Sequence, residues 1–273
     1  MRRPNRISGL VPDLRARRAD AVEQMDHPDC DLDALYRTYR GFGVVNSVVA
    51  GWQLTYRSLL RPLLEANKNG ESGESRPTTI LDIGSGGGDV PRALMRRARA
   101  DGYRVHLTAV DPDARAHDWA SAQPGVPGLE FRRATSGDLV AEGQRFDVVL
   151  SNHLLHHLDP EQFQGLLADS EALARQRVIH SDIRRSTAAY LLFSAGAGLA
   201  TPLFPGSFIR EDGLASIRRS YTPDELSAVL RPGWTVRTQP PWRNLAVWDA
   251  DGQSFGDDDR DDDREEDRGS DRG

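Results

Sequence analysis

The feature that most constrains this chain is a glycine-rich turn between an apolar run and a helix-like segment. Residues 78–83 read Thr-Thr-Ile-Leu-Asp-Ile, residues 84–88 read Gly-Ser-Gly-Gly-Gly, and residues 91–98 have the composition of a helix. Glycine lets the backbone approach a ligand closely, and the free N–H groups at a helix start carry partial positive charge. A strand, a tight loop and a helix in this order predict a nucleotide-like ligand at the carboxyl end of a parallel strand.

The spacing of the glycines narrows the kind of ligand. A dinucleotide fingerprint would need its third glycine at position 89, where the chain has Asp89. A phosphate loop would need Lys-Ser or Lys-Thr after the glycines, and neither follows. The pattern present is Asp82-x-Gly84-x-Gly86-x-Gly88, which resembles the first motif of the class I S-adenosylmethionine-dependent methyltransferases. A tight turn without a ligand is the alternative, so the rest of the chain must decide.

A second strand supports the resemblance. It covers residues 103–111 and ends in Asp111, which lies 23 residues after Gly88. A carboxylate at the tip of this strand can accept hydrogen bonds from both ribose hydroxyls of a nucleoside. The resemblance therefore assigns Asp111 and its neighbour Pro112 to the cofactor site, together with Asp82 and the three glycines of the motif.

Later strand ends carry the remaining candidates for cofactor binding. A third strand, 129–133, is followed by Thr135 and Ser136, where the family's adenine-facing pair lies. Asp138 comes a few residues later than the family's acidic residue, and a turn or helix-cap role is its alternative. A fourth strand, 145–152, ends in Asn152 and leads into Leu-His-His-Leu at 155–158. In the resembled family this segment lies beside the transferred methyl group.

The order of predicted elements indicates the fold class. Helix 161–176 and strand 177–182 continue an alternation of strands and helices, which implies an α/β fold with a parallel sheet and helices on both faces. A capped helix starting at Thr222 and two strands, 234–237 and 244–248, follow. The resemblance implies that they complete a Rossmann-like, mostly parallel sheet of seven strands with one antiparallel strand in the terminal hairpin.

The expected organisation is one methyltransferase domain with additions. Residues 1–30 are expected to form a flexible arm, 31–76 to form lid helices over the site, and 77–250 to form the methyltransferase domain. Within the lid, Gly41 and Gly43 are predicted to end a first helix, and Pro62 to kink or end a second. An apolar insertion at about 184–220 is expected to form a helical cap, and the acidic tail 251–273 to be disordered.

Composition limits the partners. The formal net charge of the 273 residues is −6, and residues 251–273 hold eleven acidic residues and four arginines, a net of −7, which leaves the rest near +1. The sequence lacks a basic stripe interleaved with aromatic residues, so we do not expect it to bind nucleic acid. Cys30 is the only cysteine and the basic N-terminus lacks a secretory apolar core, so we expect a cytoplasmic protein. Peripheral membrane contact of the apolar insertion is an alternative, but stable insertion is not expected.

The resemblance implies methyl transfer from S-adenosylmethionine to a small-molecule acceptor. We expect O-methylation of a phenolic or polyketide-like metabolite, with N- or C-methylation, or a cofactor-binding regulatory protein without catalysis, as alternatives. A base would help to remove a hydroxyl proton, and histidine suits that role near neutral pH. The candidates are His156, in the family motif, and His180, at the neighbouring strand end. No cysteine or carboxylate completes a convincing metal set with His153 and His157, so no metal is expected.

Overall fold

A computed structural model of the chain describes residues 12–68 and 76–250, apart from the side chains of Val48, Leu199, Ala200 and Thr201. The predicted disordered tail, 251–273, lies outside the described residues. So do the first eleven residues of the predicted arm and residues 69–75 of the predicted lid segment.

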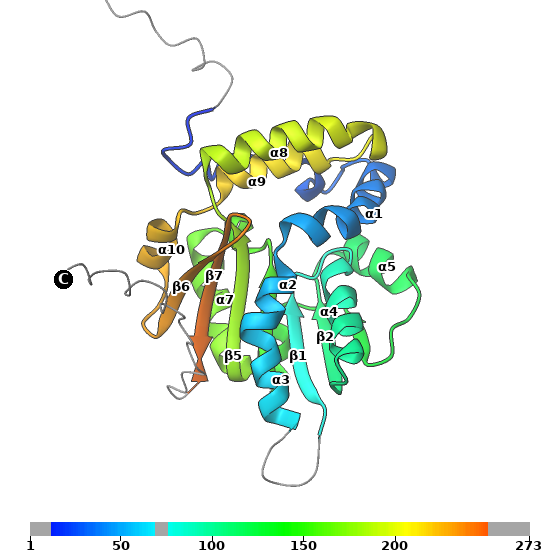
Figure 1. Ribbon diagram of the computed structural model, residues 1–273, viewed down its shortest axis with the longest axis vertical. Coiled ribbons are helices and arrows are strands. Elements are labelled where there is room, and N and C mark those ends of the chain that lie inside the picture. The colour runs from blue at the N-terminus through cyan, green and yellow to red at the C-terminus, as the bar shows by residue number, and fades with distance from the viewer. Residues whose placement is uncertain (1–11, 69–75, 251–273) are drawn as a thin grey trace, which may run out of the picture.

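A seven-stranded sheet forms the centre of the molecule (Figure 1), in the order β3-β2-β1-β4-β5-β7-β6. Strand β7 runs antiparallel to both of its neighbours, and the other adjacent pairs are parallel. The strands are β1 (Thr78–Ile83), β2 (Val105–Val110), β3 (Leu129–Arg132), β4 (Phe146–Asn152), β5 (Ala174–Ile183), β6 (Trp234–Gln239) and β7 (Arg243–Asp249). The predicted α/β fold with a seven-stranded, mostly parallel sheet is confirmed.

The register brings the candidate site residues to one edge of the sheet. Ile83, the last residue of β1, pairs with Val110 on one side and with Ser151 on the other. Asn152 at the end of β4 pairs with Ser181 of β5. The strand order reverses between β1 and β4. Open α/β sheets bind ligands in the crevice at such a reversal.

Helices cover both faces of the sheet because successive strand residues point to opposite sides. Ile80 of β1 packs in a core with the helices that precede the sheet and with α4, while Leu81 packs in a second core with the helices of the other face. The first face is covered by α2 (Trp52–Thr55), η2 (Tyr56–Leu60), α3 (Arg61–Lys68) and α4 (Asp89–Ala100). The second is covered by α6 (Ser136–Ala141), α7 (Pro160–Leu173) and α10 (Pro223–Val229).

A layer of helices lies across the carboxyl edge of the sheet (Figure 1), formed by α1 (Leu32–Val49), α8 (Thr187–Ala200) and α9 (Ile209–Arg219), with α5 (Ala114–Ala122) beside α1. The short turn η4 (Thr201–Leu203) follows α8. Among the described residues, none of the helices has both the length and the apolar character needed to cross a membrane.

Helix α1 differs from its prediction because it passes through Gly41 and Gly43 and ends only at Val49. A β-carbon at Gly41 would lie 2.5 Å from Cδ1 of Ile209 on α9, so glycine there permits the close crossing of the two helices. The chain instead breaks at Gly51, whose φ of 65° is left-handed. Tertiary packing therefore explains the glycines that the sequence pattern assigned to a helix end.

The helix before β1 does not end at Pro62, because it continues as α3 to Lys68. The π-helical turn η2 precedes the proline, and the Arg61 N–H binds the Tyr56 carbonyl five residues back. Pro62 then falls in the first turn of α3, where its missing N–H costs little.

Residues 12–30 differ from the expected flexible arm. They contain only the 3-10 turn η1 (Gln24–Asp26), and they lie against α9 and the segment after β4. The Arg17 guanidinium donates to the His156 carbonyl, the Arg18 N–H donates to the Arg218 carbonyl, and Glu23 is 3% exposed. Side-chain contacts with distant segments, which leave no periodic pattern in the sequence, hold this stretch in place.

Candidate active site

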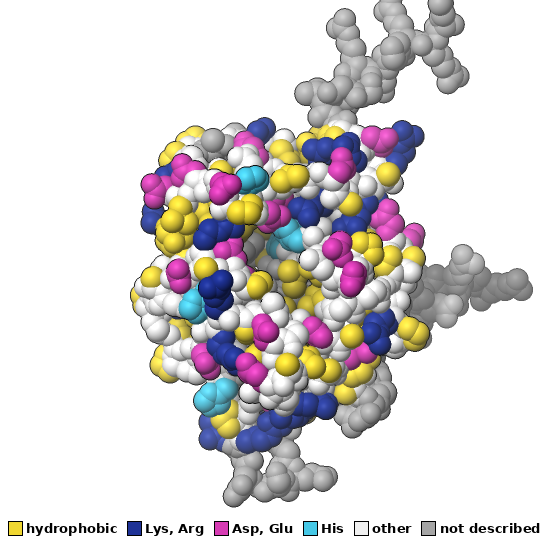
Figure 2. Space-filling view, turned by 180° about the vertical axis from the view of Figure 1, so that it is seen from behind, with side chains coloured by type: hydrophobic (Ala, Val, Ile, Leu, Met, Phe, Trp, Pro, Cys, Tyr) yellow, Lys and Arg dark blue, Asp and Glu magenta, His cyan; other side chains and the backbone are white. Residues whose placement is uncertain are grey.

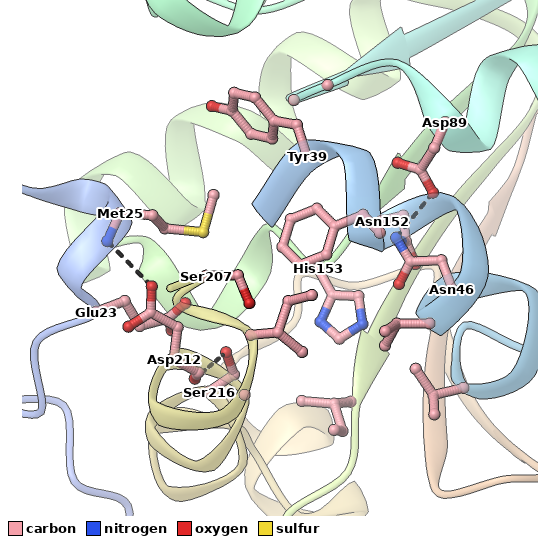
Figure 3. A pocket seen from close by; sticks show the side chains of 18 of the residues that line it. Glu23, Met25, Tyr39, Asn46, Asp89, Asn152, His153, Ser207, Asp212 and Ser216 are labelled. Atoms are coloured by element: carbon pink, nitrogen blue, oxygen red, sulfur yellow. Dashed lines mark hydrogen bonds between the residues drawn. The ribbon is translucent and has the colours of Figure 1, made fainter. Parts of the chain in front are cut away.

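A cavity of about 1070 Å³ lies between the carboxyl edge of the sheet and the helices above it. Figure 2 shows the molecule from behind, hollowed near the middle of this face, where hydrophobic, acidic and histidine side chains meet. Figure 3 shows Asp89, Asn46 and Asn152 on one side of the cavity and Glu23 and Asp212 on the other, with His153 between them. We call the first side the glycine-loop end and the second the cluster end.

The glycine-loop end is built by the turn after β1. Gly84 and Gly86 line the cavity with φ of 71° and 52°, conformations that side chains rarely adopt. A β-carbon at Gly86 would meet nothing within 4 Å, so the loop leaves open space there for a ligand. The Gly86 N–H donates to Oδ2 of Asp111 at 2.8 Å, and the Asp113 N–H donates to its Oδ1 at 2.9 Å. These bonds fix the Asp111 carboxylate at the tip of β2 and leave each oxygen able to accept from a ligand.

Three acidic side chains converge at this end. Burial, with Asp89 and Asp111 nearby, raises the pKa of Asp82 to about 8, and burial also raises the pKa values of Asp89 and Asp111. Oδ1 of Asp82 is buried without a hydrogen-bond partner, whereas Oδ2 of Asp89 accepts from Asn46 at 2.9 Å. An unpartnered buried oxygen and mutually destabilised carboxylates fit a ligand that brings hydroxyl donors and positive charge. S-adenosylmethionine has both, so Asp82, the loop glycines and Asp111 fit this cofactor.

Asn152 and His153 form the wall between the two ends. Both side chains are held by Arg243, whose guanidinium donates to Oδ1 of Asn152 at 2.7 Å and to Nε2 of His153 at 2.8 Å. Because arginine only donates, His153 is neutral with its proton on Nδ1. Burial and Arg243 lower the pKa of His153 well below its usual value. Its φ of 56° is unusual for a residue with a side chain, and such strain is often kept at functional sites.

The cluster end is organised around His156, which is 1% exposed on η3 (Leu155–His157). Its Nδ1 lies 2.7 Å from Oδ1 of Asp182, next to the last residue of β5, and its Nε2 lies 3.3 Å from Oε1 of Glu23. Burial opposes the charged form, but Asp182 and Glu23 outweigh it and raise the pKa of His156 to about 9. His156 therefore holds its second proton at neutral pH when no other cation is present.

Apolar side chains line the space above the cluster. They come from α1, α8 and the loop before α9, and they include Val45, Val49, Leu192, Phe193, Leu203 and Phe204. Leu192 and Leu203 are 58% and 74% exposed, so the apolar lining continues to the cavity mouth. An acceptor entering here would need a largely apolar body.

The structure brings most of the sequence-predicted site residues to this cavity. Among the residues predicted to bind cofactor or act in catalysis, those that line it are Asp82, Gly84, Gly86, Asp111, Pro112, Asn152 and His156. Gly88 does not line it: a β-carbon there would lie 2.6 Å from the Phe131 ring, so this glycine serves the packing of α4 on β3.

Thr135 and Ser136 also lie away from the cavity lining. Thr135 caps α6 in a reciprocal capping box with Asp138, and the Ser136 hydroxyl donates to Asp169 at 2.6 Å. The cap role considered for Asp138 is thus the one it has, and the adenine contact stays a prediction.

His180 lies beneath the cavity wall. Its ring is fully buried, its Nδ1 lies 2.7 Å from the Ser151 hydroxyl, and it stacks on Trp234. Burial lowers its pKa to about 3. The geometry gives a packing role to His180 and leaves His156 as the predicted candidate that reaches the cavity.

Sequence reasoning missed Glu23, Asn46 and Asp212. Glu23 and Asp212 line the cluster end, and both oxygens of Asp212 accept from N–H groups of η1, at 2.7 Å from Gln24 and 3.0 Å from Met25. No motif surrounds these residues, and they reach the cavity from three segments far apart in sequence. Only the three-dimensional contacts reveal them.

Residues 80–177 match a family model described as a methyltransferase domain. This match, the strand order and the glycine loop support a class I S-adenosylmethionine-dependent methyltransferase domain. The methyl donor of this class is S-adenosylmethionine, as predicted.

The chain is similar in sequence to ubiquinone biosynthesis O-methyltransferases. It is 29% identical over 157 residues to that of Roseobacter denitrificans, a match covering 56% of this chain and 57% of the relative. The match to the Cereibacter sphaeroides protein is 31% over 155 residues, covering 56% and 58%. The chain thus spans little more than half the length of the curated relatives it matches.

Solved structures resemble the chain more distantly. Human N-acetylserotonin methyltransferase in complex with S-adenosylmethionine superposes with a TM-score of 0.49 at 12% identity, covering 80% of this chain and 56% of that one. The plantazolicin methyltransferase BpumL in complex with S-adenosylhomocysteine gives a TM-score of 0.45 at 14% identity, covering 79% and 93%.

Proposed function

We propose that this chain transfers a methyl group from S-adenosylmethionine to a hydroxyl group of a small, largely apolar acceptor of phenolic or polyketide-like type. The observation that carries the proposal is the continuity of one cavity. The loop and acids suited to the donor lie at one end, and an apolar channel with a polar cluster lies at the other. At about 1070 Å³ the cavity is slightly larger than the roughly 300–1,000 Å³ usual for ligand pockets. It is thus large enough to hold donor and acceptor together.

The residues of the glycine-loop end would hold the donor. Asp111 would accept hydrogen bonds from the ribose, and the open backbone at Gly86 would lie against the ligand. Asp82 and Asp89 would face its positively charged end. Bound S-adenosylmethionine would supply a methyl group activated by its sulfonium. The acceptor oxygen would form a bond to the methyl carbon, the electron pair of the broken carbon–sulfur bond would stay on sulfur, and the hydroxyl proton would be released.

The chain's own contribution would be chiefly position and exclusion of water. Holding an acceptor atom in line about 3 Å from the methyl carbon accounts for much of the rate in such displacements. The apolar lining from α1 and α8 would seat the acceptor body, and His156 with Glu23 would orient its hydroxyl. A pKa of about 9 makes His156 a poor base at neutral pH. We therefore propose that His156 polarises this hydroxyl as a hydrogen-bond donor and does not remove its proton.

Two further assignments belong to the same proposal. The relatives are named O-methyltransferases, which favours oxygen over nitrogen or carbon as the acceptor atom. The single cysteine, Cys30, fits a reducing compartment, so we place the protein in the cytoplasm.

The test is a methyl-transfer assay with the full chain. We would supply S-adenosylmethionine labelled in its methyl group with a panel of phenols, and with amines and non-phenolic alcohols as comparison acceptors. The proposal expects labelled methyl ethers and stoichiometric S-adenosylhomocysteine from apolar phenols. Labelled amines or C-methyl products would reassign the acceptor atom, and binding of S-adenosylhomocysteine without any product would favour a regulatory protein.

A further inference from the structure

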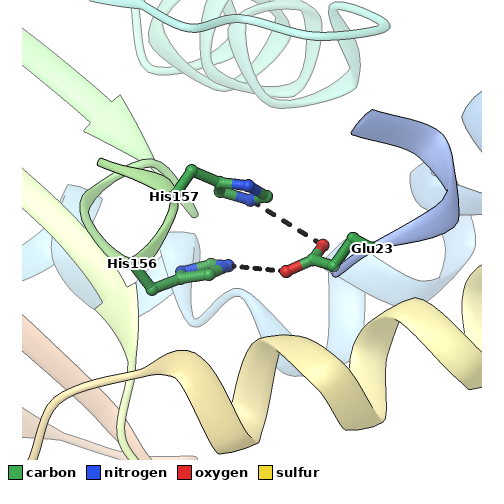
Figure 4. Close-up of side chains that lie close together, drawn as sticks. All are labelled: Glu23, His156 and His157. Carbon is green, nitrogen blue, oxygen red and sulfur yellow. Dashed lines mark ion pairs between the residues drawn. The ribbon is translucent and has the colours of Figure 1, made fainter. Parts of the chain in front are cut away.

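Glu23, His156 and His157 form a compact group at the cluster end of the cavity (Figure 4), although Glu23 comes from the segment before α1 and the histidines from η3. Nε2 of His156 lies 3.3 Å from Oε1 of Glu23, and Nε2 of His157 lies 3.7 Å from Oε2. Ligand atoms of all three residues lie within 4.8 Å of one another. Tetrahedral ligands at about 2.0–2.1 Å from zinc are roughly 3.3 Å apart, so these separations are close to those of a metal site.

The other ring nitrogens are both held by carboxylates. Nδ1 of His156 lies 2.7 Å from Asp182, and Nδ1 of His157 lies 2.9 Å from Asp26. Histidines that bind metals usually donate their second N–H to a carboxylate, which fixes the tautomer and aims the free nitrogen at the metal. Asp182 also accepts from the backbone N–H groups of His156 and Ile183, so its oxygens are engaged as an orienting group.

The facing atoms, Oε1 of Glu23 and Nε2 of His156, contact each other as an ion pair, and Arg219 lies 3.7 Å from the same oxygen. Both atoms are nevertheless buried without a hydrogen bond among the described residues, and the two residues are 3% and 1% exposed. Burying such groups without hydrogen bonds is costly. A cation between them would satisfy both atoms at once.

Charge around the group also favours a cation. Carboxylates of Glu23, Asp26 and Asp182 surround it, and Asp212 lies close enough that burial together with Glu23 and Asp26 raises its pKa to about 6. Arg219 supplies positive charge, with Nη1 3.2 Å from Asp26 and 3.7 Å from Glu23. Arg243 adds a second positive charge near Asp182, and the two arginines still leave a surplus of negative charge when the histidines are neutral.

We propose that Glu23, His156 and His157 bind one divalent transition-metal ion, zinc or an ion of similar ligand preference, through the Glu23 carboxylate and the two Nε2 atoms. Two imidazoles and a carboxylate form a donor set that suits zinc, cobalt, nickel and iron. The sequence alone predicted no metal because no carboxylate was seen to complete the set, and the fold supplies Glu23.

The position of the site suggests its use. All three residues line the cavity, so a metal with three protein ligands would keep a fourth position open toward the acceptor space. An acceptor hydroxyl bound there would lose its proton more readily, because the metal stabilises the oxyanion. This use rests on the proposed function, whereas the metal site itself does not.

The test uses the full chain without a histidine tag, stripped with a chelator and titrated with Co²⁺. We expect one equivalent to bind, with the visible absorption of four-coordinate cobalt, and Zn²⁺ to displace it. Glu23→Gln and His157→Gln should each weaken binding at least about tenfold, since each removes a ligand. His106→Gln is the matched control because His106 is exposed near the amino end of β2, and it should bind as the unmodified chain does. Circular dichroism checks that each variant is folded.

The outcomes separate this proposal from the proposed function. Absence of stoichiometric cobalt binding, or binding that survives in folded His157→Gln and Glu23→Gln chains, overturns the metal site, even where methyl transfer proceeds. Cobalt binding that depends on Glu23 and His157 supports the site even where no phenol is methylated. In that second case the proposed methyl transfer fails and the metal site stands.

Discussion

The two ends of the cavity are built in different ways. Apart from Asn46 and Asn152, the glycine-loop end comes from residues 82–113, where backbone N–H groups of the loops fix the Asp111 carboxylate at a strand tip. The cluster end joins Glu23, His156 and Asp212, which come from three segments far apart in sequence and meet at one edge of the sheet. The first end depends on local backbone geometry, and the second depends on long-range side-chain contacts. The first end can therefore persist while the second changes to suit another acceptor.

The two ends also differ in how the surroundings shift the pKa values of their carboxyl groups. At the glycine-loop end the carboxyls of Asp82, Asp89 and Asp111 have raised pKa values, because burial raises all three and outweighs the nearby Arg115 at Asp111, and none forms a salt bridge within the described part of the chain. At the cluster end the pKa values of Glu23 and Asp182 are lowered: burial opposes this, but histidine contacts outweigh it. The first end therefore suits a positively charged ligand, whereas the carboxylates of Glu23 and Asp182 at the second end are stabilised by the histidines beside them.

The largest expected effect is on turnover at the cluster end. His156→Gln should lower kcat by about 10²–10⁴-fold, the usual contribution of a group that handles a proton or an oxyanion in the transition state. Affinity for S-adenosylhomocysteine should stay within about twofold, because His156 lies away from the glycine loop. His180→Gln should reduce kcat less, since its ring packs on Trp234 outside the cavity. A larger loss in His180→Gln would move the catalytic role to that residue.

Next in size is a pH effect on stability in chelator-treated protein. The folded-state pKa of His156 is raised from 6.5 to about 9, so its stabilising contribution is fully present below about pH 6.5 and is lost as pH rises through 9. Urea unfolding at pH 7 and pH 10 should show a loss of a few kcal/mol in the unmodified chain. The loss should be clearly smaller in His156→Gln, which removes the titrating group. Equal losses in both proteins would mean that His156 is not charged in the folded state.

The same contrast explains what the sequence could predict. The alternation of strands and helices, the acids at the ends of β1 and β2 and the loop glycines are local patterns, and they led to the correct fold class. The prediction for Gly41 was wrong because this glycine permits a close approach to Ile209, which lies 168 positions later in the chain. Glu23 was missed for a similar reason: an acid in an Arg-rich segment without periodicity looks like a solvated charge until its histidine partners are seen.

The smallest expected effect concerns Thr135. Thr135→Ala removes the cap of α6, so the free energy of unfolding should fall by about 0.5–2 kcal/mol. Because Thr135 does not line the cavity, affinity for S-adenosylhomocysteine should stay within about twofold. Chemical denaturation and calorimetry measure the two quantities on one preparation. A loss of affinity comparable to that of a cofactor-contact variant would restore the adenine contact predicted from the sequence.

The most direct test of the division between the two ends is a calorimetric titration of S-adenosylhomocysteine into Asp111→Ala and Glu23→Gln, side by side. Hydrogen bonds to charged groups are worth about 1.5–3 kcal/mol, so the Kd of Asp111→Ala should rise by about tenfold or more. Glu23→Gln keeps the size of a side chain that lies at the other end, and its Kd should match that of the unmodified chain. Equal Kd values for the two variants, or a greater loss in Glu23→Gln, would contradict the assignment of the glycine-loop end to the methyl donor.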